Sequence, residues 1–191
     1  PDLATTQDTA YFYFYSCHLK AGSDVSPSTV NSDKRLAEAI VLKNYLSTKP
    51  NLKNVIVGGD FNFYDNSTAE EPAFDEILNG GTKPLNDPIN MIGPWHNNSA
   101  YADIHTQSTR TSSSNGGTGG VSGSTGGMDD RFDFIFVSND LLNGANKVKY
   151  VDNSYKAIGQ DGNRFNSSMA SPASNGVVPI DVANALYEMS D

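Results

Sequence analysis

Blocks of apolar residues, separated by short polar segments, predict strands and helices along the chain. Residues 9–16 form an aromatic run whose length and β-preferring side chains predict a strand buried on both faces or nearly so. The short apolar run at residues 53–58 predicts a second, central strand, and residues 132–137 predict a third. A further strand is expected at residues 146–151.

Three other segments carry the helical spacing of apolar residues. Residues 33–46 predict an amphipathic crossover helix, and residues 180–189 predict a short final helix. Residues 71–80 predict a third helix, because Pro72 stands at its start and Gly80 at its end. The expected apolar faces are Leu36, Ala39, Ile40 and Leu46 in the first helix, Phe74, Ile77 and Leu78 in the middle one, and Val182, Ala183, Leu186 and Met189 in the last.

Residues 112–127 interrupt this pattern with a stretch that is nearly all Ser, Gly, Thr and Asn, which predicts a flexible loop. The loop does not mark a domain boundary, since the strand at residues 132–137 needs partners from the first half of the chain to be buried. A length of 191 residues suits one domain. The elements together predict an α/β (α+β) architecture of layered sheets with helices outside.

Composition narrows the classes of function. The formal net charge of −9 argues against a basic surface that coats nucleic acid. Phosphodiester chemistry remains open, because a divalent cation can offset the charges of both the protein and the substrate. Cys17 is the sole cysteine, so no intrachain disulfide can form, and we expect it to be a buried strand residue.

The apolar runs are all too short for a membrane span, which takes about 20 residues, so none is expected. With 13 Lys plus Arg and many Asn, Ser and Thr, the composition is typical of a secreted or periplasmic protein.

Polar residues stand where the predicted elements end. His18 follows the first strand, Asp60 and Asn62 follow the second, Asp133 lies in the third, and Asp191 follows the last helix. Taken singly, a histidine there is more often structural, and an aspartate more often forms a turn. The combination favours chemistry, since a carboxylate and an amide two residues apart after a buried strand point to one side.

Four short motifs carry a family resemblance in their order along the chain. They are Ser-Cys-His-Leu-Lys-Ala at 16–21, Gly-Gly-Asp-Phe-Asn at 58–62, Arg-Phe-Asp-Phe-Ile-Phe-Val-Ser at 131–138 and Ser-Asp at 190–191. Together they resemble the C-terminal half of the endonuclease/exonuclease/phosphatase superfamily, which includes pancreatic deoxyribonuclease. The resemblance implies a four-layer α-β-β-α sandwich, of which this chain supplies about half.

The resemblance also implies roles for the polar residues. His18 corresponds to the histidine that contacts the scissile phosphate as an acid or an electrostatic stabiliser. Asp60 and Asn62 hold the attacking or metal-bound water and the phosphate oxygens. Asp133 corresponds to the carboxylate that orients a second histidine, and Asp191 to an acidic residue near the metal. Mg²⁺ suits such hard oxygen ligands best, with Mn²⁺ or Ca²⁺ as alternatives.

Two parts of the family pattern are absent from the chain. The terminal motif stops at Asp191, so the histidine that Asp133 would orient is missing. The first half of the family domain is also missing, and with it a metal-binding glutamate. We therefore expect this chain alone to be inactive or nearly so. It is expected to be one piece of a longer enzyme rather than a subunit completed by another chain, because the cut falls inside a motif.

The resulting hypothesis is a metal-dependent phosphodiesterase, in the first place a secreted nuclease that acts on nucleic acid by in-line attack of water. A phospholipid or an inositol phosphate is an alternative substrate on the same fold. A non-catalytic binding module on a decayed enzyme scaffold is the alternative of another class.

Several further polar residues are expected to be structural or solvated. Arg35 is expected on the solvated face of the first helix, with contact to a phosphate as the alternative, and Arg131 is expected to pair with the adjacent Asp129 or Asp130. That acidic pair is itself expected to be solvated, with cation binding as the alternative. The remaining two histidines, His96 and His105, flank an aromatic loop-like stretch, where a structural role is the leading interpretation and contact with substrate the alternative.

Overall fold

The computed structural model describes residues 9–65, 71–111, 126–169 and 175–189. It is a mixed α/β protein built on one four-stranded sheet with the strand order β1-β2-β4-β3. Two features predicted from the sequence fall outside the described residues: Asp191, and the Gly- and Ser-rich loop as far as residue 125.

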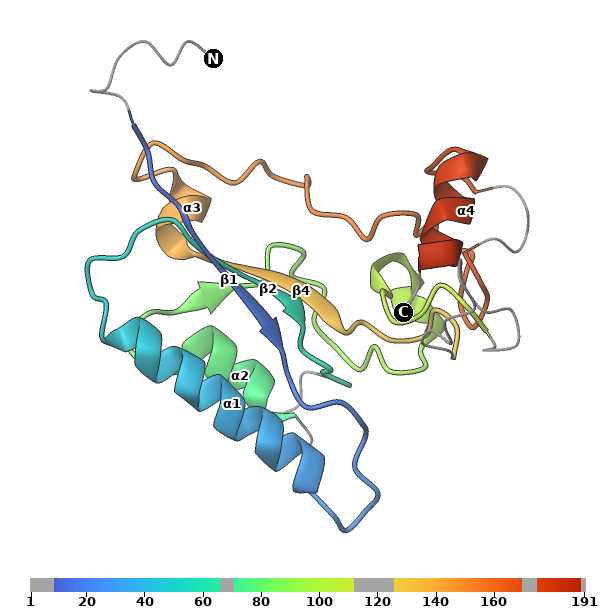
Figure 1. Cartoon of the computed structure of the whole chain (residues 1–191), viewed down its shortest axis with the longest axis horizontal. Coiled ribbons are helices and arrows are strands. Elements are labelled where there is room, and N and C mark those ends of the chain that lie inside the picture. Colours follow the sequence, from blue (N-terminus) through green and yellow to red (C-terminus); the bar gives the residue numbers. More distant parts are fainter. Residues whose placement is uncertain (1–8, 66–70, 112–125, 170–174, 190–191) are drawn as a thin grey trace.

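The sheet joins strands from both halves of the chain (Figure 1). Strand β1 (Tyr13–His18) pairs in parallel with β2 (Val55–Asp60), and β2 pairs antiparallel with β4 (Asp133–Ser138). The two-residue strand β3 (Leu85–Asn86) completes the other edge beside β4. The pairing of β2 with β4 thus joins segments on the two sides of the long loop.

The prediction of a strand at residues 146–151 is wrong. Within the described range 126–169, residues 146–151 form no strand. Their backbone makes scattered contacts instead: the N–H of Tyr150 donates to the carbonyl of Leu141 at 2.9 Å, and the carbonyls of Asn146 and Val151 accept from the Asn54 side chain at 3.2 Å and from the N–H of Ser154 at 3.0 Å. Tyr150 thus contacts the short helix α3 (Asn139–Asn143), and Val151 is 69% exposed.

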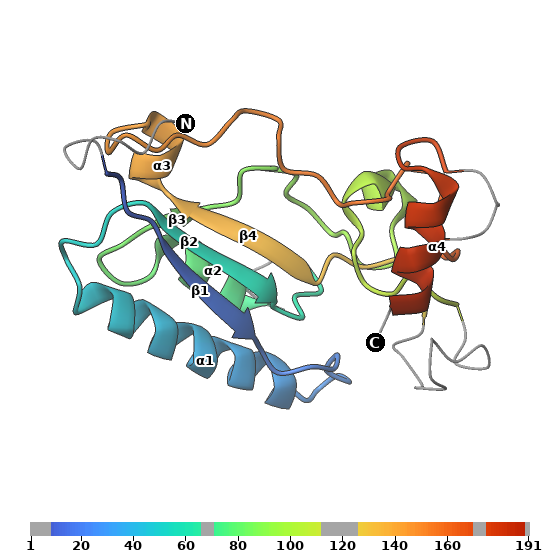
Figure 2. The same ribbon diagram turned by 45° about the horizontal axis from the view of Figure 1, so that its top comes forward.

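Helices α1 (Val30–Ser47) and α2 (Pro72–Asn79) lie on the same side of the sheet (Figure 2). The crossover helix α1 joins the parallel strands β1 and β2. Its first turn is capped from a distance, because the Asp24 carboxylate accepts the N–H groups of Asn31 at 2.7 Å and Ser32 at 2.9 Å.

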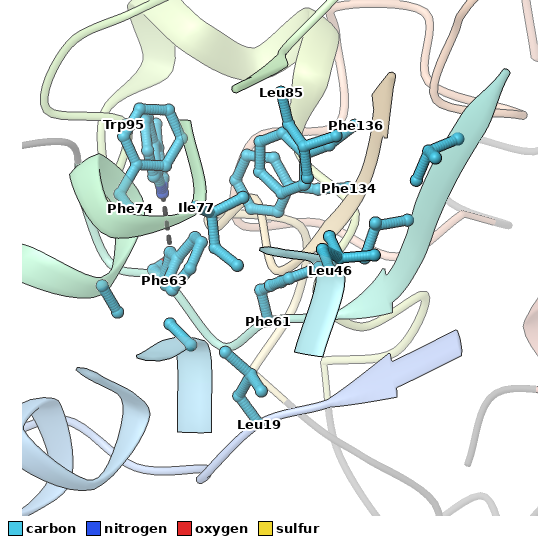
Figure 3. Close-up of a cluster of buried hydrophobic side chains, with 14 residues drawn as sticks. Leu19, Leu46, Phe61, Phe63, Phe74, Ile77, Leu85, Trp95, Phe134 and Phe136 are labelled. Atoms are coloured by element: carbon cyan, nitrogen blue, oxygen red, sulfur yellow. Dashed lines mark hydrogen bonds between the residues drawn. The ribbon is translucent and has the colours of Figure 1, made fainter. Parts of the chain in front are cut away.

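The main core fills the space between the sheet and these helices (Figure 3). The Phe134 and Phe136 rings of β4 stack with centroids 5.2 Å apart, and the Phe61 ring meets the Phe136 ring edge-on at 5.0 Å. The buried indole N–H of Trp95 donates to the Phe63 carbonyl at 3.1 Å. The core therefore rigidly supports the segment that leaves β2 at Asp60.

The face of the sheet opposite the helices, the open face, is exposed. The first strand is therefore not buried on both faces, as its aromatic run predicted. That strand is displaced toward the C-terminus relative to the expected range, and Phe14 is 58% exposed. On β4, Ile135 is 42% exposed on the same face. Because β1 is an edge strand and helices cover one face alone, Cys17 on the helix side is only half-buried.

Helix α1 buries two cations, contrary to the expectation that Arg35 is solvated. Arg35 is 1% exposed and Lys43 is fully buried, whereas Ile40, expected to be buried, is 39% exposed. The Lys43 ammonium donates to the carbonyl of Ile77 at 2.7 Å and to that of Lys83 at 2.6 Å. The buried stripe of α1 thus depends on polar partners supplied by distant segments.

Arg131 also differs from its predicted pairing. Its guanidinium donates to the two carboxylate oxygens of Asp87 at 2.6 and 2.8 Å, rather than to the adjacent acidic residues. Both side chains are buried, so this ion pair ties the start of β4 to the segment after β3.

The C-terminal part of the described chain forms a second, smaller core. The final helix α4 (Ile180–Met189) packs Ala183 against Met128 and Met169, while Val182, expected on its buried face, is 38% exposed. The 3₁₀ helix η2 (Ser99–Ile104) precedes His105. Helices in the described ranges are too short or too polar to cross a lipid bilayer.

Candidate functional site

Three strands bring three of the predicted polar residues into one row. His18, at the end of β1, is the register partner of Asp60, at the end of β2. Asp60 is in turn the partner of Asp133, the first residue of β4. Directly paired residues of neighbouring strands project from the same face. The row therefore lies on the open face, at the edge where β1 and β2 end and β4 begins.

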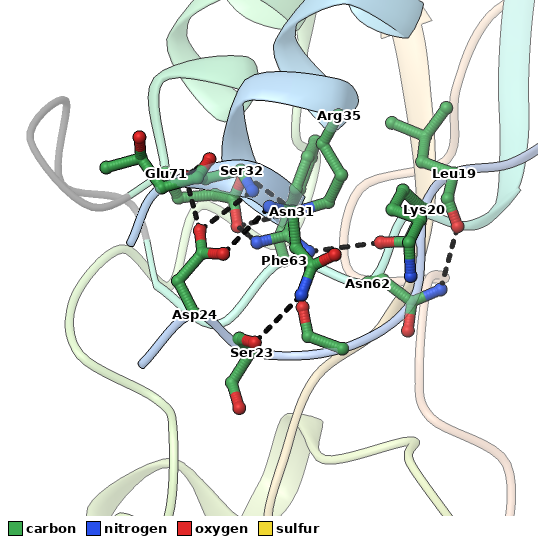
Figure 4. A network of polar contacts seen from close by, with 12 residues as sticks. Leu19, Lys20, Ser23, Asp24, Asn31, Ser32, Arg35, Asn62, Phe63 and Glu71 are labelled. Carbon is green, nitrogen blue, oxygen red and sulfur yellow. Dashed lines mark hydrogen bonds and ion pairs between the residues drawn. The ribbon is translucent and has the colours of Figure 1, made fainter. Parts of the chain in front are cut away.

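The turn after β2 places Asn62 beside this row. One carboxylate oxygen of Asp60 accepts the N–H of Asn62 at 2.9 Å, which closes a tight turn and holds Asn62 at a positive φ of 53°. The side-chain amide of Asn62 donates to the carbonyl of Leu19 at 3.1 Å (Figure 4). Its amide oxygen is thereby directed away from Leu19 and remains an acceptor.

These residues line one pocket of about 560 Å³. Its wall consists of His18, Ala21, Asp60, Asn62, Gln107, Phe132 and Asp133. Four of the five residues singled out in the sequence therefore lie together. The fifth, Asp191, is outside the described residues.

The pocket contains two carboxylates side by side. Burial raises the pKa of Asp60, while the hydrogen bond from Asn62 and the proximity of His18 act in the opposite direction. His18 is exposed, and its Nε2 lies 3.8 Å from Asp60 Oδ2. Like charges on directly paired residues repel each other, so Asp60 and Asp133 together favour the arrival of a cation.

The donor set fits a hard divalent cation that keeps several waters. Asp60 provides a carboxylate and Asn62 an amide oxygen, and Mg²⁺ typically uses one or two protein carboxylates together with substrate phosphate. Across the part of the chain that the structure describes, no three His, Cys, Asp or Glu side chains form a ready metal cluster. The residues present therefore suit an open Mg²⁺ site rather than a closed protein cage.

Two contributors to this pocket were missed by sequence reasoning. The Thr106 hydroxyl accepts the N–H groups of Phe132 at 3.2 Å and Asp133 at 3.0 Å, which anchors the start of β4. Gln107, the next residue, lines the pocket. No motif distinguishes either residue, because their role depends on a contact between segments 26 or more residues apart.

A second pocket of about 390 Å³ lies at the start of α1. Among the residues that line it are Tyr64, Arg35 and Glu71, and the last two form a fully buried ion pair with a separation of 2.7 Å (Figure 4). Burial raises the pKa of Glu71 to about 7, and Arg35 opposes this rise. His96 also lines this pocket.

Asp130 differs from its predicted solvated position. Its side chain is 3% exposed, and both carboxylate oxygens lie 2.9 Å from Nδ1 of His96, whose side chain is 54% exposed. His105, by contrast, is fully buried with each ring nitrogen near a backbone carbonyl, in keeping with the structural role expected for it.

Comparison with known proteins adds no relative. No protein-family model, curated protein or solved structure matches this chain significantly.

Proposed function

We propose that this chain carries part of the catalytic site of a metal-dependent phosphodiesterase, specifically a secreted nuclease that hydrolyses phosphodiester bonds by in-line attack of water. The observation that supports this most is the row of His18, Asp60 and Asp133, with Asn62 beside it, around one pocket. An imidazole, two carboxylates and an amide are the groups needed to bind a phosphate, position a water and move a proton.

Each residue has a role suited to its position. His18 is exposed on the strand edge, where its imidazole can donate to a phosphate oxygen or to the leaving oxygen. The side-chain amide of Asn62 is held by the carbonyl of Leu19, and its oxygen would accept from a bound water. Asp133 is anchored through Thr106 and is the carboxylate that would orient a second imidazole.

A Mg²⁺ ion would be held by Asp60 and Asn62, with Asp191 as a further ligand according to the motif resemblance. When bound, it supplies positive charge that stabilises the charge developing on the phosphate oxygens.

A second sheet is part of the proposal. The sandwich that the motifs resemble requires an N-terminal half, and the open face of Phe14 and Ile135 is the surface it would cover. A cysteine introduced at Ile135 should react with a thiol reagent quickly in this chain and slowly in the product of the full reading frame. Equal reaction rates would exclude such a cover.

The catalytic test uses the product of the full reading frame. With Mg²⁺ it should cleave DNA and bis(p-nitrophenyl) phosphate, and the 191-residue chain alone should not. Replacement His18→Ala or Asp60→Ala should lower the rate by about 10² or more. The exposed α1 variant Lys34→Ala serves as the control and should retain the full rate. Normal rates in both site variants would refute the proposal.

A further inference from the structure

Tyr64 separates the catalytic pocket from the pocket at the start of α1. Its ring meets the ring of His96 at a centroid distance of 5.3 Å and that of Phe132 at 5.0 Å, edge-on in both cases. His96 lines the α1 pocket, and Phe132 lines the catalytic pocket. The ring of Tyr64 is thus in contact with one wall residue of each pocket.

His96 has the chemistry of a ligand-contacting side chain. The buried Asp130 carboxylate can only accept, so it takes a hydrogen bond from Nδ1–H of the imidazole. When the ring is neutral, this places the proton on Nδ1 and leaves Nε2 as an acceptor. Burial raises the pKa of Asp130 to about 6, and the hydrogen bond with His96 opposes this rise. In its neutral form the ring accepts a hydrogen bond from its ligand.

The charges around the same pocket disfavour an anion. Asp24 already accepts the N–H groups of the first turn of α1, at Asn31 and Ser32. The guanidinium of Arg35 is engaged by Glu71 and by two backbone carbonyls. Phosphate would meet these carboxylates without a cation to receive it. The ligand should therefore be neutral, hydroxyl-bearing and able to lie against an aromatic ring.

We propose that this pocket binds a nucleoside unit, namely the one attached to the scissile phosphate, with His96 accepting a sugar hydroxyl or a base amino group and Tyr64 supporting the base. This inference rests on the proposed phosphodiesterase function, which places the phosphate beside His18. The volume of about 390 Å³ lies in the range of small-molecule sites. The aromatic wall favours a nucleoside over a simple polyol.

The three histidines of the chain make the test direct, because their imidazole nitrogens can be resolved by NMR on the ¹⁵N-labelled 191-residue chain. Variants His96→Gln and His18→Ala assign the signals. Thymidine should shift the Nε2 signal of His96 and leave His18 unchanged. Inorganic phosphate with Mg²⁺ should shift His18 and leave His96 unchanged. In Tyr64→Ala and in His96→Gln, the affinity for thymidine, measured from backbone amide shifts, should fall about tenfold or more.

The outcomes separate the two proposals. No response of His96 to thymidine, in a chain whose amide spectrum shows an intact fold, overturns the nucleoside site. An equal response to myo-inositol also overturns it, since the pocket would then bind polyols in general. A response of His96 to thymidine, combined with normal cleavage rates of His18→Ala and Asp60→Ala in the product of the full reading frame, overturns the phosphodiesterase proposal instead.

Discussion

Arg35 of α1 and Glu71, the residue before α2, form a bidentate ion pair in which each side chain is 1% exposed. The Arg35 guanidinium also donates to the carbonyls of Lys20 at 3.0 Å and Gly22 at 2.9 Å. The pair therefore holds the segment that follows His18 against both helices. Its loss should affect the sheet edge that carries His18 as well as the core.

The variant Arg35→Met should lower the free energy of unfolding by about 3 to 5 kcal/mol, because it leaves the Glu71 carboxyl buried without its partner. Urea unfolding followed by the fluorescence of Trp95, the single tryptophan, measures this change. The matched control is Lys34→Met at the neighbouring exposed position, where the change should stay within about 0.5 kcal/mol. Equal effects of the two replacements would contradict the buried ion pair.

Lys43 should make stability depend on alkaline pH. Burial lowers its pKa from 10.5 to about 8 in the folded chain, so between these values the unfolded chain binds more protons. The free energy of unfolding of the wild type should therefore rise, relative to that of Lys43→Met, as the pH increases from about 8 toward 10.5. Urea unfolding of both proteins at several pH values in this range tests the sign. A constant difference would mean that Lys43 titrates normally.

Gly59 should tolerate substitution less well than its neighbour Gly58. Gly59 has a φ of +137°, and an added Cβ would overlap the carbonyl oxygen of Cys17 on the paired strand. Gly59→Ala should therefore lower the free energy of unfolding by about 3 kcal/mol and disturb the register of His18 with Asp60. At Gly58 the added carbon would lie 3.2 Å from the exposed ring of Phe14, which can move. Gly58→Ala should cost less than about 1 kcal/mol, and similar losses at both positions would be unexpected.

Replacement of two neighbouring residues of β4, Phe134 and Ile135, should also lower stability by different amounts. Phe134 is 1% exposed and lies among the rings of Phe61, Phe63, Phe74, Trp95 and Phe136. Phe134→Ala should lower the free energy of unfolding by about 3 to 5 kcal/mol. Ile135 is 42% exposed on the open face, so Ile135→Ala should lower the free energy of unfolding by less than about 1.5 kcal/mol. Denaturant unfolding of the two variants measures the contrast between the faces.

Local pattern predicted the elements well. Helices α1, α2 and α4 and strands β1, β2 and β4 all lie within a few residues of the expected ranges. Residues 146–151 had comparable strand character but join no strand within the described residues. The two-residue strand β3 was missed, because prolines on both sides of it mask the signal. The hydrophobic pattern therefore identifies the secondary structure that a segment favours. Pairing with a neighbouring strand decides whether a predicted strand forms.

The candidate site was predictable for a similar reason. His18, Asp60 and Asp133 stand at the ends of recognisable strands, so sequence alone indicated a common edge. His96 and Asp130, in contrast, occur in loops 34 residues apart and carry no motif. Their contact follows from the way distant loops pack beside the sheet.

The amino-acid sequence by itself determined the order of strands and helices and the polar residues at their ends, because hydrophobic periodicity is a local property. Only the tertiary structure decided which face of the sheet is covered, that Arg35 and Lys43 are buried, and that Asp130 holds His96. The physical reason is that burying a charged side chain is costly unless a hydrogen-bonding or oppositely charged group compensates for the lost hydration. Here these groups come from segments far away in the chain.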